Sequence, residues 1–239
     1  MYTSFEFQIN YEHCKLHRPV VASSTLAAMS EISRRAAGRY RSVDTAGVST
    51  VDSLFDATRR LLDKKSFNDI SVADVLVEAG ISRATFYFYF SSKFSVLCGL
   101  LERAMDDIFD TVQPFLVRSD EDSPEEALER SLRAVTAAWH RHRPILQAAA
   151  HHWHSDAGLH ELWLSIVERF VSAGAEEIER ERAAGLITSN ESGRTLASTL
   201  FWGTERVLYI AGLAVEPSLP DEEAALGPLV AMWHGTLYG

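Results

Sequence analysis

Three predicted helix starts follow one another closely in this chain, and their spacing constrains the fold more than any other feature. Ser71, Ser82 and Ser92 each stand where a serine side chain can cap the first turn of a helix. Gly80 is placed to close the first of these helices, because glycine readily takes the left-handed conformation at a helix end. Two helices joined by a tight turn and followed immediately by a third describe a helix-turn-helix unit.

A longer apolar stripe precedes this unit. Between residues 51 and 62, side chains suited to the protein core recur at spacings of three and four, as along one face of a helix. They are Val51, Leu54, Phe55, Thr58, Leu61 and Leu62. We therefore predict an N-terminal three-helix helix-turn-helix domain over residues 49–95. A long further helix is expected from Phe94 to about Phe115.

The rest of the chain keeps the helical period. Apolar spacing and capping residues predict helices over about 124–141, 144–154, 157–184, 190–214 and 222–238. No segment shows a convincing strand pattern or an internal repeat. The fold class is therefore predicted to be all-α, with about nine helices and a C-terminal helical domain over residues 96–239.

Residues 1–48 show no sustained period and are predicted to form a flexible N-terminal arm. The arm ends in a basic cluster made of Arg34, Arg35, Arg39 and Arg41. The whole chain has a net charge of −10, but residues 31–103 hold 11 Lys/Arg against 9 Asp/Glu, and residues 104–239 hold 10 against 22. This asymmetry suits a DNA-reading head on an acidic body. Chance variation of the surface is the alternative interpretation.

Several classes of protein are disfavoured. The sequence contains no nucleophile elbow, phosphate loop, dinucleotide fingerprint or His-Glu-x-x-His motif, so we do not expect an enzyme. His151 and His154 could share a helix face around a metal, but surface histidines are the favoured interpretation, and we predict neither a metal nor a cofactor. No apolar run approaches the roughly 20 residues of a membrane helix, and no signal peptide is visible, so a cytoplasmic protein without a membrane partner is expected.

Five consecutive aromatic residues distinguish the helix that begins after Ser82. Phe86 and Phe90 are four residues apart and can share the inward face, so Tyr87, Phe88 and Tyr89 must be at least partly exposed. Tyrosine hydroxyls reach phosphates, and ring faces can touch thymine methyl groups in a major groove. An aromatic plug of a small domain is the alternative. The turn, the caps and the charges together favour contact with duplex DNA.

The segment from Gly80 to Lys93 resembles the signature of the TetR family of repressors. The matching positions are Gly80, Ile81, Ser82, Thr85, Phe86, Tyr87, Tyr89, Phe90, Ser92 and Lys93. The chain departs from the pattern at Ala84, Ser91 and Phe94, and none of these changes removes a helix or a phosphate donor. The aromatic run, together with Thr204-Glu205-Arg206, Trp233 and the ending Leu237-Tyr238-Gly239, further resembles the subgroup of the mycobacterial ethionamide-resistance repressor.

The resemblance implies a ligand-responsive transcriptional repressor that binds a palindromic operator as a homodimer and is released by a small apolar effector. DNA contacts are expected from Ser71, Ser82, Arg83, Ala84, Thr85, Tyr87, Phe88, Tyr89 and Lys93. The helices over about 190–214 and 222–238 are expected to form a four-helix dimer interface. A tubular ligand pocket is expected to be lined by Trp139, Trp163, Phe170, Phe201, Thr204 and Trp233. A helical ligand-binding or scaffold protein that does not bind DNA is the alternative.

Overall fold

The computed structural model describes residues 50–112 and 123–239, apart from the side chains of residues 109–112. The described residues form nine α-helices and no strand, which confirms the predicted all-α class. They divide into two compact units, which we call the head (residues 50–99) and the body (residues 100–239, described except for 113–122). The predicted N-terminal arm lies outside the described residues.

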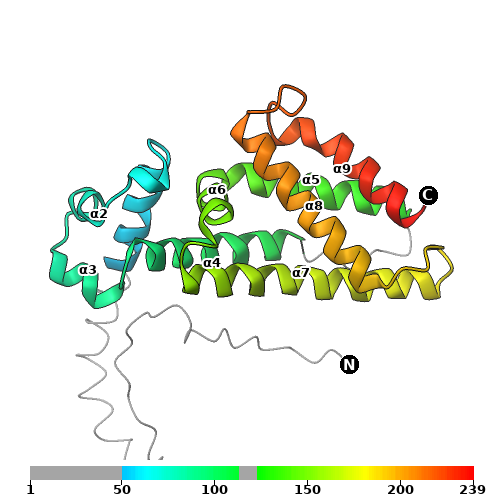
Figure 1. The fold of residues 1–239 in the computed structure, drawn as a ribbon, viewed down its shortest axis with the longest axis horizontal. Coiled ribbons are helices and arrows are strands. Elements are labelled where there is room, and N and C mark those ends of the chain that lie inside the picture. The colour runs from blue at the N-terminus through cyan, green and yellow to red at the C-terminus, as the bar shows by residue number, and fades with distance from the viewer. Residues whose placement is uncertain (1–49, 113–122) are drawn as a thin grey trace, which may run out of the picture. The chain divides into compact units, whose positions relative to one another are not determined.

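The head contains four helical segments and the start of a fifth (Figure 1). A helix over residues 50–62 is followed by a short 3-10 turn, η1 (Phe67–Asp69), which the sequence pattern did not predict. Next come α2 (Val72–Ala79) and α3 (Arg83–Tyr89). The long helix α4 (Lys93–Val112) begins in the head and continues into the body.

Local capping sets the bounds of the two short helices. The Ser71 side chain accepts a hydrogen bond from the Asp74 amide, and the Asp74 carboxylate accepts one from the Ser71 amide, which forms a complete capping box at α2. Gly80 ends α2 with a φ of 67°, a left-handed conformation that favours glycine. Ser82 then caps α3 by accepting from the Thr85 amide. The sequence predicted all three of these boundary residues, and the structure confirms them.

Lys93 ties the start of α4 to the turn before α2. Its ammonium nitrogen donates to the carbonyl oxygens of Phe67 at 2.8 Å, Asn68 at 3.3 Å and Ile70 at 2.8 Å. The same nitrogen lies 4.6 Å from the centroid of the Phe67 ring. Burial lowers the pKa of Lys93, and the nearby Asp69 carboxylate opposes that shift. This side chain therefore joins segments that are more than 20 residues apart in sequence.

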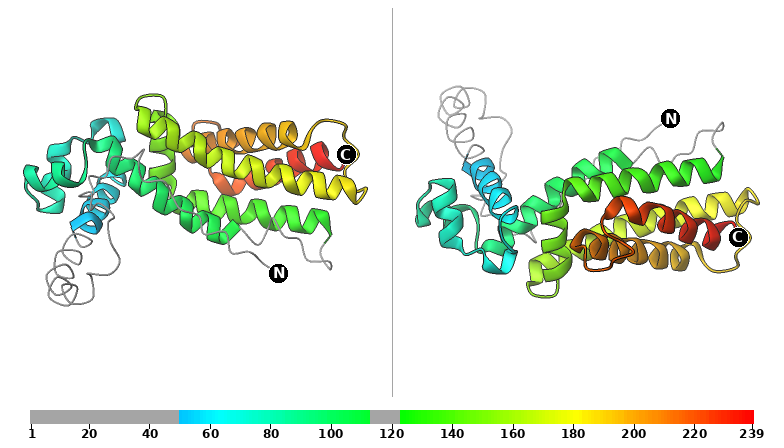
Figure 2. Two further views of the ribbon diagram at one scale, coloured as in Figure 1. Left: turned by 90° about the horizontal axis from the view of Figure 1, so that it is seen from below. Right: turned by 90° about the horizontal axis from the view of Figure 1, so that it is seen from above.

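The body is a bundle of helices around an apolar interior. Its elements are the end of α4, then α5 (Pro124–Arg141), α6 (Arg143–His152), α7 (Ala157–Ala183), α8 (Gly193–Leu213) and α9 (Glu222–Leu237). Helix α7 packs against α8, and α9 packs against both α5 and α8. The short helix α6 stands across the direction of α7 (Figures 1 and 2). The predicted helices agree with these elements to within three residues.

One fully buried acid holds the first turn of α9 in the body. Glu222 has no exposed surface, and it accepts a hydrogen bond from Arg143 Nε at 2.6 Å and lies 3.2 Å from His140 Nδ1. Burial alone would raise the pKa of Glu222, but the hydrogen bonds, chiefly that from Arg143, leave it lowered. Because an unpaired buried carboxylate is costly, this contact fixes the start of α9 against α5 and α6.

The contacts of Lys93 predict that the Lys93→Met variant has a less stable head. The variant keeps a linear side chain but loses hydrogen bonds from a charged donor to three carbonyls, which lowers the free energy of unfolding by about 2 kcal/mol. Chemical denaturation of the full chain measures the loss, and hydrogen exchange at the Ile70 amide should accelerate with it. Lys64→Met at an exposed position is the control, with an expected change below roughly 0.5 kcal/mol. Equal stabilities of the two variants would contradict this role for Lys93.

Candidate functional site

Helix α3 has one buried side and one exposed side. Phe86 and Phe90 are 0% and 1% exposed, and the Phe90 ring centroid lies 5.6 Å from that of Phe55 on the first helix. Tyr87 and Phe88 are 46% and 57% exposed. The predicted inward pair is thus confirmed. The aromatic residues between them stand at the surface because the helical period does not allow five consecutive residues to face one core.

The first turn of α3 offers polar groups to solvent. Ser82 Oγ and Thr85 Oγ1 lie 2.8 Å apart and share one hydrogen bond, so one of the two hydroxyl hydrogens remains for an outside acceptor. Arg83 and Ala84 are exposed, and Arg83 makes no hydrogen bond or ion pair with any residue that the structure describes. Tyr89 is half-buried against Phe88, with ring centroids 4.9 Å apart. This end of α3 therefore presents a cation, a hydroxyl and aromatic surface.

Two of the predicted DNA-contacting residues use their donors inside the head. The amide and hydroxyl of Ser71 both donate to Asp74 Oδ2 at 2.7 Å, and these bonds, with a smaller contribution from Lys65, lower the pKa of Asp74 to about 2. The ammonium of Lys93 donates to the carbonyls of Phe67, Asn68 and Ile70. Both residues are predicted to contact DNA, and in the described head both hold adjoining segments together.

The described head has no surplus of positive charge. Residues 50–99 hold six Lys/Arg and six Asp/Glu, and the predicted basic cluster of the arm lies outside the described residues. Arg60 pairs with Glu78 at 2.7 Å, and Lys65 lies 3.1 Å from Asp74. Nearby acids therefore match these two cations. Arg83 is the basic residue of α3, and it is exposed.

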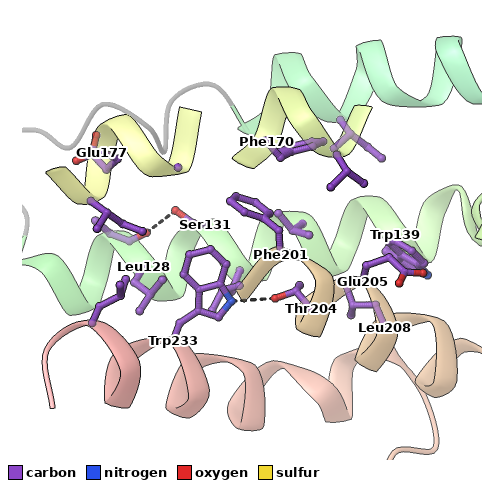
Figure 3. A pocket seen from close by; sticks show the side chains of 18 of the residues that line it. Leu128, Ser131, Trp139, Phe170, Glu177, Phe201, Thr204, Glu205, Leu208 and Trp233 are labelled. Atoms are coloured by element: carbon purple, nitrogen blue, oxygen red, sulfur yellow. Dashed lines mark hydrogen bonds between the residues drawn. The ribbon is translucent and has the colours of Figure 1, made fainter. Parts of the chain in front are cut away.

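A cavity of about 200 Å³ lies in the body and is lined by residues of α4 to α9 (Figure 3). Its wall is mostly apolar, as expected of a site for an apolar molecule. All six residues that the sequence predicted for a ligand pocket line this cavity: Trp139, Trp163, Phe170, Phe201, Thr204 and Trp233.

Three aromatic rings build the centre of the wall. The Phe201 ring centroid lies 5.7 Å from that of Phe170 and 5.2 Å from that of Trp233, and the second pair is nearly perpendicular. Trp233 Nε1 donates to Thr204 Oγ1 at 2.8 Å, which fixes the indole (Figure 3). Gly174 makes room for this arrangement, because a Cβ atom there would come within 2.6 Å of the Phe201 ring. The aromatic wall is therefore held in place by its own contacts.

The acidic residues of this cavity were not predicted from the sequence. Glu177, Glu181 and Glu205 all line it. A usable signal was present for Glu205, which follows Phe201 by four positions and precedes Leu208 by three, so that one helix face carries all three residues. Burial raises the pKa of Glu205, and the Arg206 charge opposes that shift only in part.

Two other tryptophans of the body lie outside the cavity lining. Trp153 and Trp202 are not among its residues, and their ring centroids lie 6.0 Å apart. Within residues 50–112 and 123–239, no three His, Cys, Asp or Glu side chains gather closely enough to hold a metal ion. No helix in these ranges has the length and apolar character needed to cross a membrane.

Two sequence families match this chain. Residues 54–97 match the family "Bacterial regulatory proteins, tetR family", and residues 128–239 match "Transcriptional regulator EthR, C-terminal domain". The first match falls on the head and the start of α4, and the second covers the body from α5 onward.

Curated relatives and solved structures agree with these families. The HTH-type transcriptional regulator EthR of Mycolicibacterium smegmatis is 30% identical over 202 residues, which are 83% of this chain and 91% of that protein. The EthR protein of Mycobacterium tuberculosis is 30% identical over 188 residues, covering 78% and 86%. In fold, the chain is similar to the fatty acid degradation regulator FadR of Bacillus halodurans, with a TM-score of 0.64, 16% identity and coverage of 78% and 95%. The structure of SmeT from Stenotrophomonas maltophilia gives a TM-score of 0.62 at 16% identity, covering 79% and 90%.

The family, the relatives and the helix-turn-helix head lead to one assignment. The matched families and the curated relatives are transcriptional regulators and not enzymes. This chain therefore belongs to the TetR family of DNA-binding transcriptional regulators, among its EthR-like members.

Proposed function

We propose that this chain is a homodimeric repressor that holds a palindromic operator and releases it when a small apolar effector enters the body cavity. One observation carries the proposal: α3 is anchored by Phe86 and Phe90, while Arg83, Tyr87 and Phe88 remain exposed. A rigidly held helix with an outward polar and aromatic face is the geometry that helix-turn-helix proteins insert into a major groove.

The exposed face of α3 suits a groove about 12 Å wide, which admits one helix. Arg83 and Tyr87 are four residues apart on one face, where a guanidinium and a phenol can both reach phosphates. Ala84 and Phe88 form the neighbouring apolar row, which suits thymine methyl groups. Ser71 and Lys93 belong to the proposed interface because they hold the segments beside α3 in place. The residues of the proposed interface are Ser71, Ser82, Arg83, Ala84, Thr85, Tyr87, Phe88, Tyr89 and Lys93.

Helix α9 supports the dimer. Its inward residues include Leu229 and Trp233, which are buried in the body. Its exposed positions include Gly227, Ala231 and Gly235, which allow a second helix to approach closely. A helix that is apolar on both sides requires cover on both sides. We therefore propose that α8 and α9 pair with the same helices of a second copy, which would place two α3 helices on successive major grooves.

Release follows from differential binding. The proposed effector site is lined by Trp139, Trp163, Phe170, Phe201, Thr204 and Trp233. An effector shifts the protein between DNA-binding and released states only by its difference in affinity for the two states. Helix α4 has residues in both units, so it is the covalent element through which a change in the body would reach the head.

We expect Arg83→Ala and Tyr87→Ala to weaken DNA binding without unfolding the protein. In mobility shifts with duplexes selected from a random pool, wild-type affinity should fall linearly with salt on logarithmic axes. Arg83→Ala should reduce that slope by about one. Tyr87→Ala should weaken binding roughly tenfold, because the loss of one hydrogen bond to a charged phosphate lowers affinity by about that much.

Arg133→Ala is the matched control, because Arg133 is an exposed arginine of the body. It should leave both the affinity and the salt slope unchanged. Wild-type behaviour of both head variants would contradict the assigned interface. If the unmodified protein fails to shift any selected duplex at low salt, the scaffold alternative is correct.

The proposed dimer predicts that Ala231→Glu produces monomers. A carboxylate at this exposed position on α9 would be buried without a partner when two copies associate. Light scattering after size exclusion should give one chain mass for the variant at micromolar concentration and two for the wild type. Ala183→Glu makes the same change at an exposed site on α7 and should remain dimeric. A dimeric Ala231→Glu protein would place the interface elsewhere.

A further inference from the structure

The charged groups of the body cavity all have one sign. Its lining contains the carboxyl groups of Glu177, Glu181 and Glu205, and it contains no lysine, arginine or histidine among the described residues. An apolar cavity of this kind offers no positive partner to a bound carboxylate or phosphate. Charge complementarity therefore disfavours anionic ligands and favours cationic ones.

Two of these acids already have partners. Glu177 pairs with Arg180, which lies three residues further along α7. Glu181 accepts a hydrogen bond from the Tyr238 hydroxyl at 2.5 Å. Glu177 also stands toward the opposite end of the cavity from Glu205 in Figure 3. Each of these two acids therefore already has a charged or hydrogen-bonding partner within the protein.

Glu205 differs from both. Its side chain is only 10% exposed, and neither carboxyl oxygen has a hydrogen-bond partner among the described residues. The nearest cation, Arg206 Nη2, lies 3.7 Å away, beyond hydrogen-bond distance, and Arg206 is more than half exposed and also lies over the Tyr209 ring. A buried carboxylate without hydrogen bonds destabilises the folded protein. A donor supplied by a ligand would remove that destabilisation.

We propose that Glu205 is the recognition group for a protonated amine carried on an elongated apolar body. This inference rests on the proposed role of the cavity as the effector site, and it names the chemical class of the effector. The amine donates to the Glu205 oxygens, and the alkyl chain lies along the wall formed by Phe170, Phe201 and Trp233. The indole nitrogens of Trp139 and Trp163 are also buried without partners in the described part of the chain, and an oxygen acceptor elsewhere on the ligand would satisfy them.

Three probes with one chain length test this selectivity: n-decylamine, n-decanol and sodium n-decanoate, below their micellar concentrations. Titrations of the full-length protein are followed by tryptophan fluorescence, since Trp139, Trp163 and Trp233 line the cavity, and by calorimetry. The amine should bind at least tenfold more tightly than the alcohol, and the decanoate should bind most weakly. Equal affinities of amine and alcohol, or preference for decanoate, would overturn the inference.

Glu205→Gln keeps the shape of the side chain and removes its charge. We expect this variant to bind decylamine roughly 10- to 100-fold more weakly and decanol with unchanged affinity. Unchanged decanol binding also shows that the variant is folded. Glu168→Gln is the matched control, because Glu168 is an exposed acid of α7 outside the cavity, and its amine affinity should equal that of the wild type.

The outcomes separate the two proposals. If decanol binds and weakens DNA binding but the amine preference is missing, the cavity is an effector site and the assignment of Glu205 is wrong. An amine preference that survives in Glu205→Gln leads to the same conclusion about Glu205. If none of the three probes binds, the proposed effector site fails, and the inference about Glu205 fails with it.

Discussion

The packing of Phe86 and Phe90 into the core of the head is the interaction that holds α3 in place. A helix of seven residues has too few internal hydrogen bonds to persist alone, so its geometry comes from the two rings that it places in the core. Their spacing of four residues also decides what remains outside. With both rings inward, Arg83 and Tyr87 form one exposed row, and Ala84 and Phe88 form the next. The same contact thus stabilises the helix and orients its outer face.

In the body, contacts between aromatic side chains likewise hold the cavity wall in place. Phe201 contacts both Phe170 and Trp233, and the Trp233–Thr204 hydrogen bond fixes the indole, so the wall is ordered without a ligand. Neither carboxyl oxygen of Glu205 has a hydrogen-bond partner among the described residues around this wall. A preformed apolar wall provides affinity for many molecules, whereas a buried acid without a hydrogen-bond partner discriminates among them by charge.

Local signals in the sequence predicted much of this architecture, and contacts between distant segments account for what it did not predict. Ser71, Gly80 and Ser82 define the ends of α2 and α3 through bonds within a few residues, so their roles could be predicted. The contacts of Lys93 could not be predicted in the same way. The carbonyls that accept hydrogen bonds from its ammonium lie in and directly after a 3-10 turn more than 20 residues earlier. The cavity wall followed from aromatic composition and family resemblance. The lack of a hydrogen-bond partner for Glu205 could not be predicted, because it depends on how the other helices pack around this side chain.

The central claim is that α3 enters duplex DNA, and hydrogen exchange of the full chain with and without a bound duplex tests it most directly. We expect slower exchange of the amides of residues 82–89 in the complex, at DNA concentrations where the mobility shift is complete. Unchanged exchange in residues 82–89, with protection appearing in the body instead, would contradict the insertion of α3 into the groove.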